Sequence, residues 1–320
     1  MPVLPDYHEF EGRHWETGSI RNALAYQGVK APHTGQPLTE AMLMGISGGA
    51  VMGYFSFAYK GYDPLVAILT RNTFHPMDTI FERLAIPQQV YQTGNDQKAV
   101  ANLMRALGED SAPLVWADYY LLPYNNQTHD AGMWGAFPLV VFGYESETDT
   151  VRIADRARVP LTITTDELAA ARRRIKQDKN RLMTLDAPDM NRLASAVQKG
   201  IFDCLKLYTE APPKGSRSNF GLPAFQTWAR ALTSPKPKNS WDSVFPAGRP
   251  LFCGLTSAYE RLFTFGHDSR AERDTYADFL DEAAVLLNRP ALKDAARLFR
   301  RSAQAWEAVG MALLPEDVAP

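Results

Sequence analysis

Cysteine is scarce in this sequence, because the 320 residues contain only Cys204 and Cys253. Two widely separated thiols provide neither a disulfide framework nor the closely spaced ligand pairs of a zinc site. We therefore expect both to be small buried hydrophobic residues, and we place the protein in the reducing cytoplasm. His75, His129 and Asp130 are too scattered to suggest a metal site. The sequence thus predicts no metal and no cofactor.

Long apolar runs and an excess of one charge are also lacking. No stretch approaches the ~18–20 uninterrupted apolar residues of a membrane-spanning helix. Residues 1–6 lack the basic start and apolar run of a secretory signal. Lysine and arginine total 34 against 36 aspartate and glutamate residues, so no overall field attracts nucleic acid or an anionic membrane. We expect neither as a partner.

The first half of the chain predicts helices packed on a sheet. Apolar residues at helical spacing predict helices over 19–26, 39–44 and 98–107. Thr17 or Gly18 is the expected cap of the first helix, and Thr39 that of the second. Short apolar and aromatic runs then predict strands over 113–122, 137–144 and 151–154, the last two forming a hairpin.

Beyond about residue 166 the strand signals stop and helical periodicity takes over. Helices are expected over residues 166–179, over 276–287 and from Pro290 onward. A helix-covered sheet followed by helices is an α+β arrangement. The sequence predicts two domains, residues 1–165 and residues 166–320, the second mainly α-helical.

The segment Gly12-Arg13-His14-Trp15-Glu16-Thr17-Gly18 stands immediately before the first expected helix. A helix N-terminus offers N–H groups and partial positive charge, which stabilise a thiolate or an oxyanion. Cysteine acyl-transfer enzymes place their nucleophile at such a helix start. This segment has that layout, but it contains no cysteine.

From this segment onward the chain resembles the butirosin biosynthesis protein H family, in which the helix start typically reads His-Cys. The order and spacing of several motifs carry the resemblance over nearly the whole chain: His14 to Asn22, Leu38-Thr39-Glu40, Gly45 to Gly53, Pro113 to Val115, Asp118 to Tyr124, Val140 to Tyr144, Val151 to Arg156, Asn219 to Leu222 and Tyr276 to Ala283. The resemblance implies a papain-like (cysteine-peptidase-like) N-terminal domain and the helical domain that commonly follows it. The family's namesake transfers an aminoacyl group from a carrier-protein thioester to an amine of an aminoglycoside.

The resemblance also assigns three catalytic positions. The nucleophile position falls on Trp15, the general-base position on Phe137 at the start of the Val-Val-Phe-Gly-Tyr strand, and the orienting acid on Asp155. An indole N–H only donates, and a phenyl ring neither donates nor accepts a proton. Two large aromatic residues would instead fill the space where a thiol and an imidazole face each other. Without its histidine, Asp155 is expected to pair with Arg156, Arg158 or a backbone N–H.

The first hypothesis is therefore a repurposed or non-catalytic member of an acyl-transfer family in specialised-metabolite biosynthesis. The partners that it implies are an acyl carrier protein, a catalytic paralogue, or a small-molecule or peptide-like ligand, and the chain is a candidate homodimer. A third class of function is a dimeric scaffold or regulator, which would be distinguished by a partner but no ligand.

The alternative hypothesis is an active hydrolase or acyltransferase that uses other groups. Gly45-Ile46-Ser47-Gly48-Gly49 matches G-x-S-x-G, in which a strained strand-to-helix turn exposes a serine nucleophile. A helix rather than a strand is expected before Ser47, which favours a tight turn instead. A second route would use His14, Glu16 and Asp155 as acid and base.

Aromatic residues crowd the expected sheet and can line an apolar cleft for an acyl or planar substrate, although core packing explains them equally well. The positions assigned to substrate binding are Glu16, Ser47, Trp116, Asp118, Tyr120 and Trp134.

Overall fold

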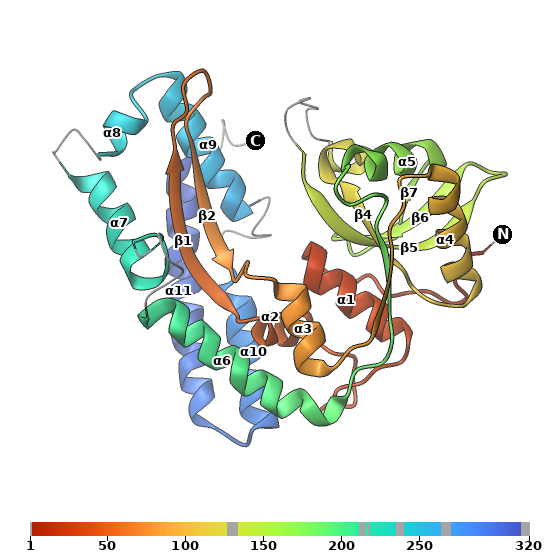
Figure 1. Ribbon diagram of the computed structural model, residues 1–320. Helices are drawn as coiled ribbons and strands as arrows, with labels where there is room; N and C mark the ends of the chain where they lie inside the picture. The colour runs from red at the N-terminus through yellow and green to blue at the C-terminus, as the bar shows by residue number, and fades with distance from the viewer. Residues whose placement is uncertain are drawn as a thin grey trace. The chain divides into compact units, whose positions relative to one another are not determined.

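The computed structural model describes residues 2–126, 134–210, 216, 218–234, 240–263 and 270–314 (Figure 1). Helices and antiparallel strands together confirm the α+β class. Contacts between residues separate the chain into two compact units, each built from two segments. Unit 1 comprises Met1–Leu43 and Ile80–Leu193, and unit 2 comprises Met44–Thr79 and Ala194–Pro320.

Unit 1 is organised around a six-stranded antiparallel sheet with the strand order β3-β8-β4-β5-β6-β7. Its strands are β3 (Gln88–Tyr91), β4 (Leu114–Asp118), β5 (Ala136–Glu145), β6 (Thr150–Ala154), β7 (Leu161–Ile163) and β8 (Leu182–Leu185). The central strands β4 and β5 are buried along most of their length, which explains their nearly continuous apolar sequence. The strands expected from the first half of the sequence are confirmed as β4, β5 and β6, with β4 ending at Asp118.

Three helices pack against this sheet. Helix α1 (Trp15–Tyr26) contacts β4 and β5, α4 (Asp96–Gly108) contacts β5 and β8, and α5 (Thr165–Arg174) contacts β4 and β6. The short helices α2 (Glu40–Ile46) and α3 (Pro76–Leu84) lie where the chain passes between the two units. The backbone N–H of Met42 donates to the Thr39 hydroxyl, which confirms Thr39 as the cap of α2.

The expected cap of α1 is wrong, because the helix begins earlier than the apolar spacing suggested. The N-cap is His14, whose Nδ1 accepts a hydrogen bond from the Glu16 N–H at 3.4 Å. Thr17 is already helical, and its hydroxyl donates to the Glu40 carboxylate. A cap residue needs extended backbone, and only His14 has it here (φ −115°, ψ 144°).

The expectation that strands stop near residue 166 is also wrong, because β8 inserts between β3 and β4. Four residues are too short for an alternating pattern to be recognised, and only pairing with distant strands defines them. With α5 and β8 both returning to the sheet, unit 1 continues to Leu193. The contact units thus divide the chain differently from the predicted domains of residues 1–165 and 166–320.

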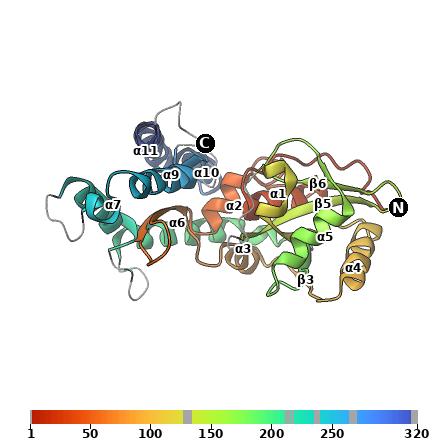
Figure 2. The same cartoon turned by 90° about the horizontal axis from the view of Figure 1, so that it is seen from above.

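Unit 2 combines a hairpin that was not predicted with a set of helices. The hairpin consists of β1 (Ala50–Phe57) and β2 (Leu65–Arg71). The helices are α6 (Leu193–Thr209), α7 (Gly221–Thr233), α8 (Trp241–Val244), α9 (Arg249–Phe263), α10 (Arg273–Leu286) and α11 (Ala291–Leu313). The last two confirm the expected C-terminal helices, and Figure 2 shows α11 beside α10 and α9.

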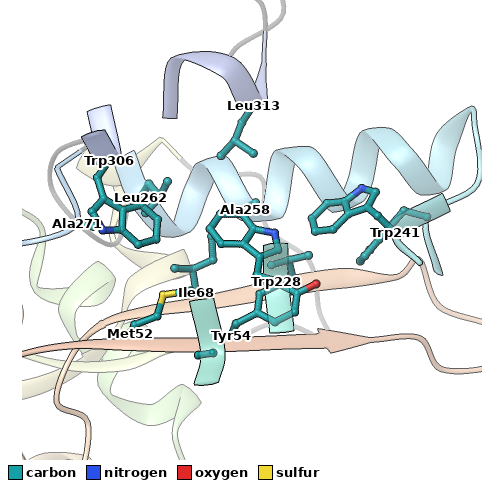
Figure 3. Close-up of a cluster of buried hydrophobic side chains, with 13 residues drawn as sticks. Met52, Tyr54, Ile68, Trp228, Trp241, Ala258, Leu262, Ala271, Trp306 and Leu313 are labelled. Carbon is teal, nitrogen blue, oxygen red and sulfur yellow. The ribbon is translucent and has the colours of Figure 1, made fainter. Parts of the chain in front are cut away.

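The core of unit 2 lies between the hairpin and its helices. Met52, Tyr54 and Ile68 of the hairpin face Ala258 and Leu262 of α9 in one buried apolar cluster (Figure 3). Indole rings from α7, α8 and α11 complete this cluster. None of the helices in the described ranges has the length and apolar character needed to cross a bilayer.

Candidate functional site

The start of α1 is held in place by two glycines and one carboxylate. A Cβ atom on Gly12 would lie 2.6 Å from the Gly18 Cα, so the two backbones touch only because neither residue has a side chain. The Glu40 carboxylate accepts hydrogen bonds from the N–H groups of Arg13 and His14 and from the Thr17 hydroxyl, each at 2.8 Å. A negative charge of the protein itself therefore lies at the positive end of α1.

Trp15 and Phe137 are brought face to face by α1 and β5. Their ring centroids are 4.1 Å apart and the ring planes are inclined by 16°, which is a stacked pair in van der Waals contact. The Ser19 hydroxyl donates to the backbone carbonyl of Pro138 at 3.1 Å and fixes α1 against the strand beside Phe137. Trp15 is only 5% exposed. The structure thus places together the two positions that the sequence assigned to nucleophile and base.

Asp155 lies at the end of β6 and is buried in a polar network. The Tyr124 hydroxyl donates to its Oδ2 at 3.1 Å, and the Arg156 Nε lies 3.3 Å from its Oδ1. The expected pairing of Asp155 with Arg156 is therefore confirmed. Burial and the Asp155 carboxylate raise the pKa of the Tyr124 hydroxyl well above its ordinary value, so Tyr124 keeps its proton and remains the donor.

The same arginine connects this network to the aromatic pair. The Arg156 guanidinium carbon lies 4.5 Å from the centroid of the Trp15 ring and 5.2 Å from that of Tyr119. Its Nη2 also donates to the Asn125 side-chain carbonyl at 2.8 Å. Tyr119 meets both Trp15 and Phe137 edge to face. The site is therefore a cation–π and aromatic cluster rather than a polar reaction centre.

Asp118 and Tyr120 border this cluster in the turn after β4. The buried Asp118 Oδ1 accepts from the N–H groups of Tyr120 and Gly135, which shapes the turn η1 (Tyr119–Leu121). Its Oδ2 has no hydrogen-bond donor in the described structure and lies 3.7 Å from the Arg174 Nε. Half-buried Tyr120 meets Tyr119 edge to face.

The two tryptophans assigned to substrate binding lie in different environments. Trp116 on β4 is buried, with the Arg181 guanidinium 4.2 Å from its ring centroid. Trp134 is 52% exposed. Trp116 thus packs in the core, whereas Trp134 offers a ring to solvent.

Ser47 belongs to unit 2 and to a turn that runs from helix α2 to strand β1. This order is the reverse of the strand-to-helix elbow that exposes a nucleophilic serine. Ser47 is 4% exposed, its hydroxyl donates to the Met44 carbonyl at 2.7 Å, and its own carbonyl accepts from the Asn72 side chain. Gly48 and Gly49 have positive φ angles of 109° and 72°, which the tight turn requires. The geometry supports a structural turn.

Two contributions to the site were not anticipated from the sequence. The sequence motif Leu38-Thr39-Glu40 pointed to the right segment, but not to the three hydrogen bonds of Glu40. Arg156 was expected only as a partner of Asp155, and its contact with the Trp15 ring was missed. Within the described ranges, no three His, Cys, Asp or Glu side chains gather as metal ligands, and His129 and Asp130 lie outside those ranges.

The comparisons with known proteins agree with the resemblance found in the sequence. Residues 14–156 match the model of the family described as butirosin biosynthesis protein H, N-terminal. No protein with a curated description matches the chain. The matched segment begins at the N-cap of α1, ends at Arg156 and so contains the whole cluster around Trp15. This segment, residues 14–156 of the 320, is therefore similar to the N-terminal domain of butirosin biosynthesis protein H.

Proposed function

We propose that this chain is a repurposed member of its family that no longer forms a covalent acyl-enzyme and acts in specialised-metabolite biosynthesis by binding. The observation that carries this proposal is the stacking of Trp15 on Phe137, the two residues that the resemblance assigns to the nucleophile and base positions. Acyl transfer through an enzyme thioester needs a nucleophile and a base that takes its proton. Neither ring can supply these functions, and losing both removes the covalent route.

The geometry supports loss of the site rather than its rearrangement. Rings with centroids 4.1 Å apart leave no space between them for a substrate carbonyl. The Arg156 guanidinium lies against the indole, and Asp155 is engaged by Tyr124 and Arg156. The Glu40 carboxylate at the start of α1 further opposes a developing oxyanion.

The elements that position the pair are nevertheless present in the described part of unit 1. Helix α1 packs on the central strands of an antiparallel sheet, which supports the papain-like assignment. Trp134, which is exposed, shortly precedes Phe137 in the sequence, and half-buried Tyr120 contacts Tyr119 of the cluster. Both residues therefore offer aromatic surface for binding. We therefore assign the chain a binding role, with a carrier-protein thioester, a peptide-like intermediate or a catalytic paralogue as the candidate partner.

Intact-mass spectrometry with an acyl N-acetylcysteamine thioester tests this proposal. Partly exposed Cys253 should be replaced by serine in the tested protein, since a surface thiol can be acylated without any active site. A Cys-containing paralogue serves as the positive control. We expect an acyl adduct on the paralogue and no mass increase on this chain. An adduct that peptide mapping places within residues 14–156 would overturn the proposal.

A further inference from the structure

Two apolar cavities lie along one face of α11 in unit 2. Their volumes are about 520 Å³ and about 490 Å³, each within the range of pockets that bind small organic ligands. Phe225 of α7 and Ser302 of α11 line both cavities, so the two adjoin. Leu232, Leu298 and Val309 leave much of their apolar surface exposed at this face. This face of α11, together with the adjoining part of α7, therefore offers an apolar surface that the described helices leave partly exposed.

The first cavity is lined by three of the six tryptophans of the chain, Trp228, Trp241 and Trp306. The rings of Trp228 and Trp306 stack with their centroids 5.9 Å apart, and Figure 3 shows both side chains in the buried cluster of unit 2. Trp228 is 7% exposed, and its Nε1–H has no hydrogen-bond acceptor in the described structure. A buried donor without an acceptor is costly unless a ligand or solvent atom satisfies it.

The second cavity is lined by an arginine that is almost completely buried. Arg273 is 1% exposed, and among the described residues its guanidinium donates to three neutral oxygens: the carbonyls of Thr70 and Ala271 and the Tyr208 hydroxyl, at 3.4, 2.5 and 2.8 Å. No carboxylate of the described residues forms an ion pair with it. The adjacent Glu272 is engaged by Arg71, with N–O distances of 2.7 and 3.1 Å.

A buried cation without a counterion is strongly disfavoured, and an anion that enters the cavity relieves this cost. The Arg273 guanidinium lies 5.3 Å from the centroid of the Trp306 ring, so the charge is close to both cavities. Ala271 and Glu272 directly precede this arginine and have positive φ angles of 52° and 62°, so the backbone is strained at the start of α10.

We propose that unit 2 binds an organic anion with an extended apolar body, such as a medium-chain carboxylate. Its carboxylate pairs with the Arg273 guanidinium, and its apolar body lies along α11 beside Phe225 and the indoles. This site is separate from the cluster around Trp15 and does not depend on the function proposed for it.

Decanoate and decan-1-ol are probes of equal chain length that differ in charge, and quenching of tryptophan fluorescence reports their binding. We expect wild-type protein to bind decanoate at least about tenfold more tightly than the alcohol, because a charge-assisted hydrogen bond with the guanidinium forms only with the acid. Arg273→Gln should remove this preference. Arg297→Gln, which changes an exposed arginine of α11, should preserve it. Thermal melts by circular dichroism confirm that each variant is folded.

Ser302→Phe provides a test that leaves the buried charge intact. This half-buried residue lines both cavities, so a phenyl ring there should weaken decanoate binding by about tenfold or more. The proposal fails if wild-type protein does not bind decanoate at about 1 mM, or if the alcohol binds equally well. It also fails if Ser302→Phe has no effect on decanoate binding. A further contradictory result would be a dimer, detected by light scattering, that Ser302→Phe dissociates and decanoate does not, because this face would then be an interface between two copies of the chain.

Discussion

Replacing Trp15 by alanine should destabilise unit 1, since this ring is a buried core residue, and replacing half-buried Phe137 should do so to a smaller extent. Truncating a buried aromatic residue costs about 3–5 kcal/mol, and Trp15 is 5% exposed. Of this loss, about 0.5–2 kcal/mol reflects the Arg156 cation–π contact. Loss of the stacked pair itself accounts for about 0.5–1.5 kcal/mol. Trp15 and Phe137 therefore contribute more to the stability of unit 1 than a cysteine and a histidine would at the same positions.

A double-mutant cycle isolates the contribution of the pair. The free energy of unfolding would be measured by urea titration, followed by far-UV circular dichroism, for Trp15→Ala, Phe137→Ala and the double variant. We expect the two losses to be non-additive by about 0.5–1.5 kcal/mol, because each single change already removes the stack.

Phe142 provides the matched control on the same strand. It lies about 16 Å further along β5 than Phe137 and stacks on Tyr7 instead. Phe142→Ala and Trp15→Ala should be additive to within about 0.5 kcal/mol. If the coupling of Trp15 with Phe137 is no larger than its coupling with Phe142, the aromatic pair does not stabilise unit 1 and the reasoning is refuted.

Three further outcomes follow from the structure. Burial raises the pKa of Tyr124 and of Tyr276, so the native state keeps protons that the unfolded chain loses above about pH 10. Stability is thus full below about pH 10 and should fall above it, seen as a falling urea midpoint between about pH 10 and pH 12. Gly12→Ala should lower the free energy of unfolding by about 1–3 kcal/mol, measured by thermal denaturation. Gly108→Ala, which has open space at its Cβ, should leave it unchanged or raise it by up to about 1 kcal/mol. Equal effects of the two changes would contradict the close approach of Gly12 and Gly18. Ser47→Ala should cost about 1 kcal/mol for its hydrogen bond and leave any turnover or ligand binding unchanged, whereas abolished turnover would revive the serine hydrolase hypothesis.

The sequence predicted the α+β class and several of the elements that carry the cluster around Trp15. The hairpin of β5 and β6 comes from short apolar runs that a local pattern identifies, whereas the positions of Trp15, Phe137 and Asp155 were assigned by the family resemblance. Local periodicity also identified α4, α5, α10 and α11. The expectation that two large aromatic residues fill one space agrees with their stacking.

Features created by distant contacts left no such local pattern. Strand β8 exists because it pairs with β3 and β4, and the hairpin of β1 and β2 is buried by helices far along the chain. The three bonds of Glu40 and the position of Arg156 over the indole depend on tertiary packing in the same way. Thr17 has a good capping side chain, but its hydroxyl donates to Glu40, so residue type alone selected the wrong cap.

The central claim is that Trp15 and Phe137 occupy the positions of a lost nucleophile and its base. The most direct test compares Trp15→Cys with the double variant Trp15→Cys/Phe137→His, both in the Cys253→Ser protein, by the pH dependence of iodoacetamide alkylation. We expect the introduced thiol to ionise at least about 1 pH unit lower in the double variant than in the single one, since an adjacent imidazolium stabilises the thiolate. Identical profiles near the ordinary thiol pKa of about 8.5 in both variants would contradict the account.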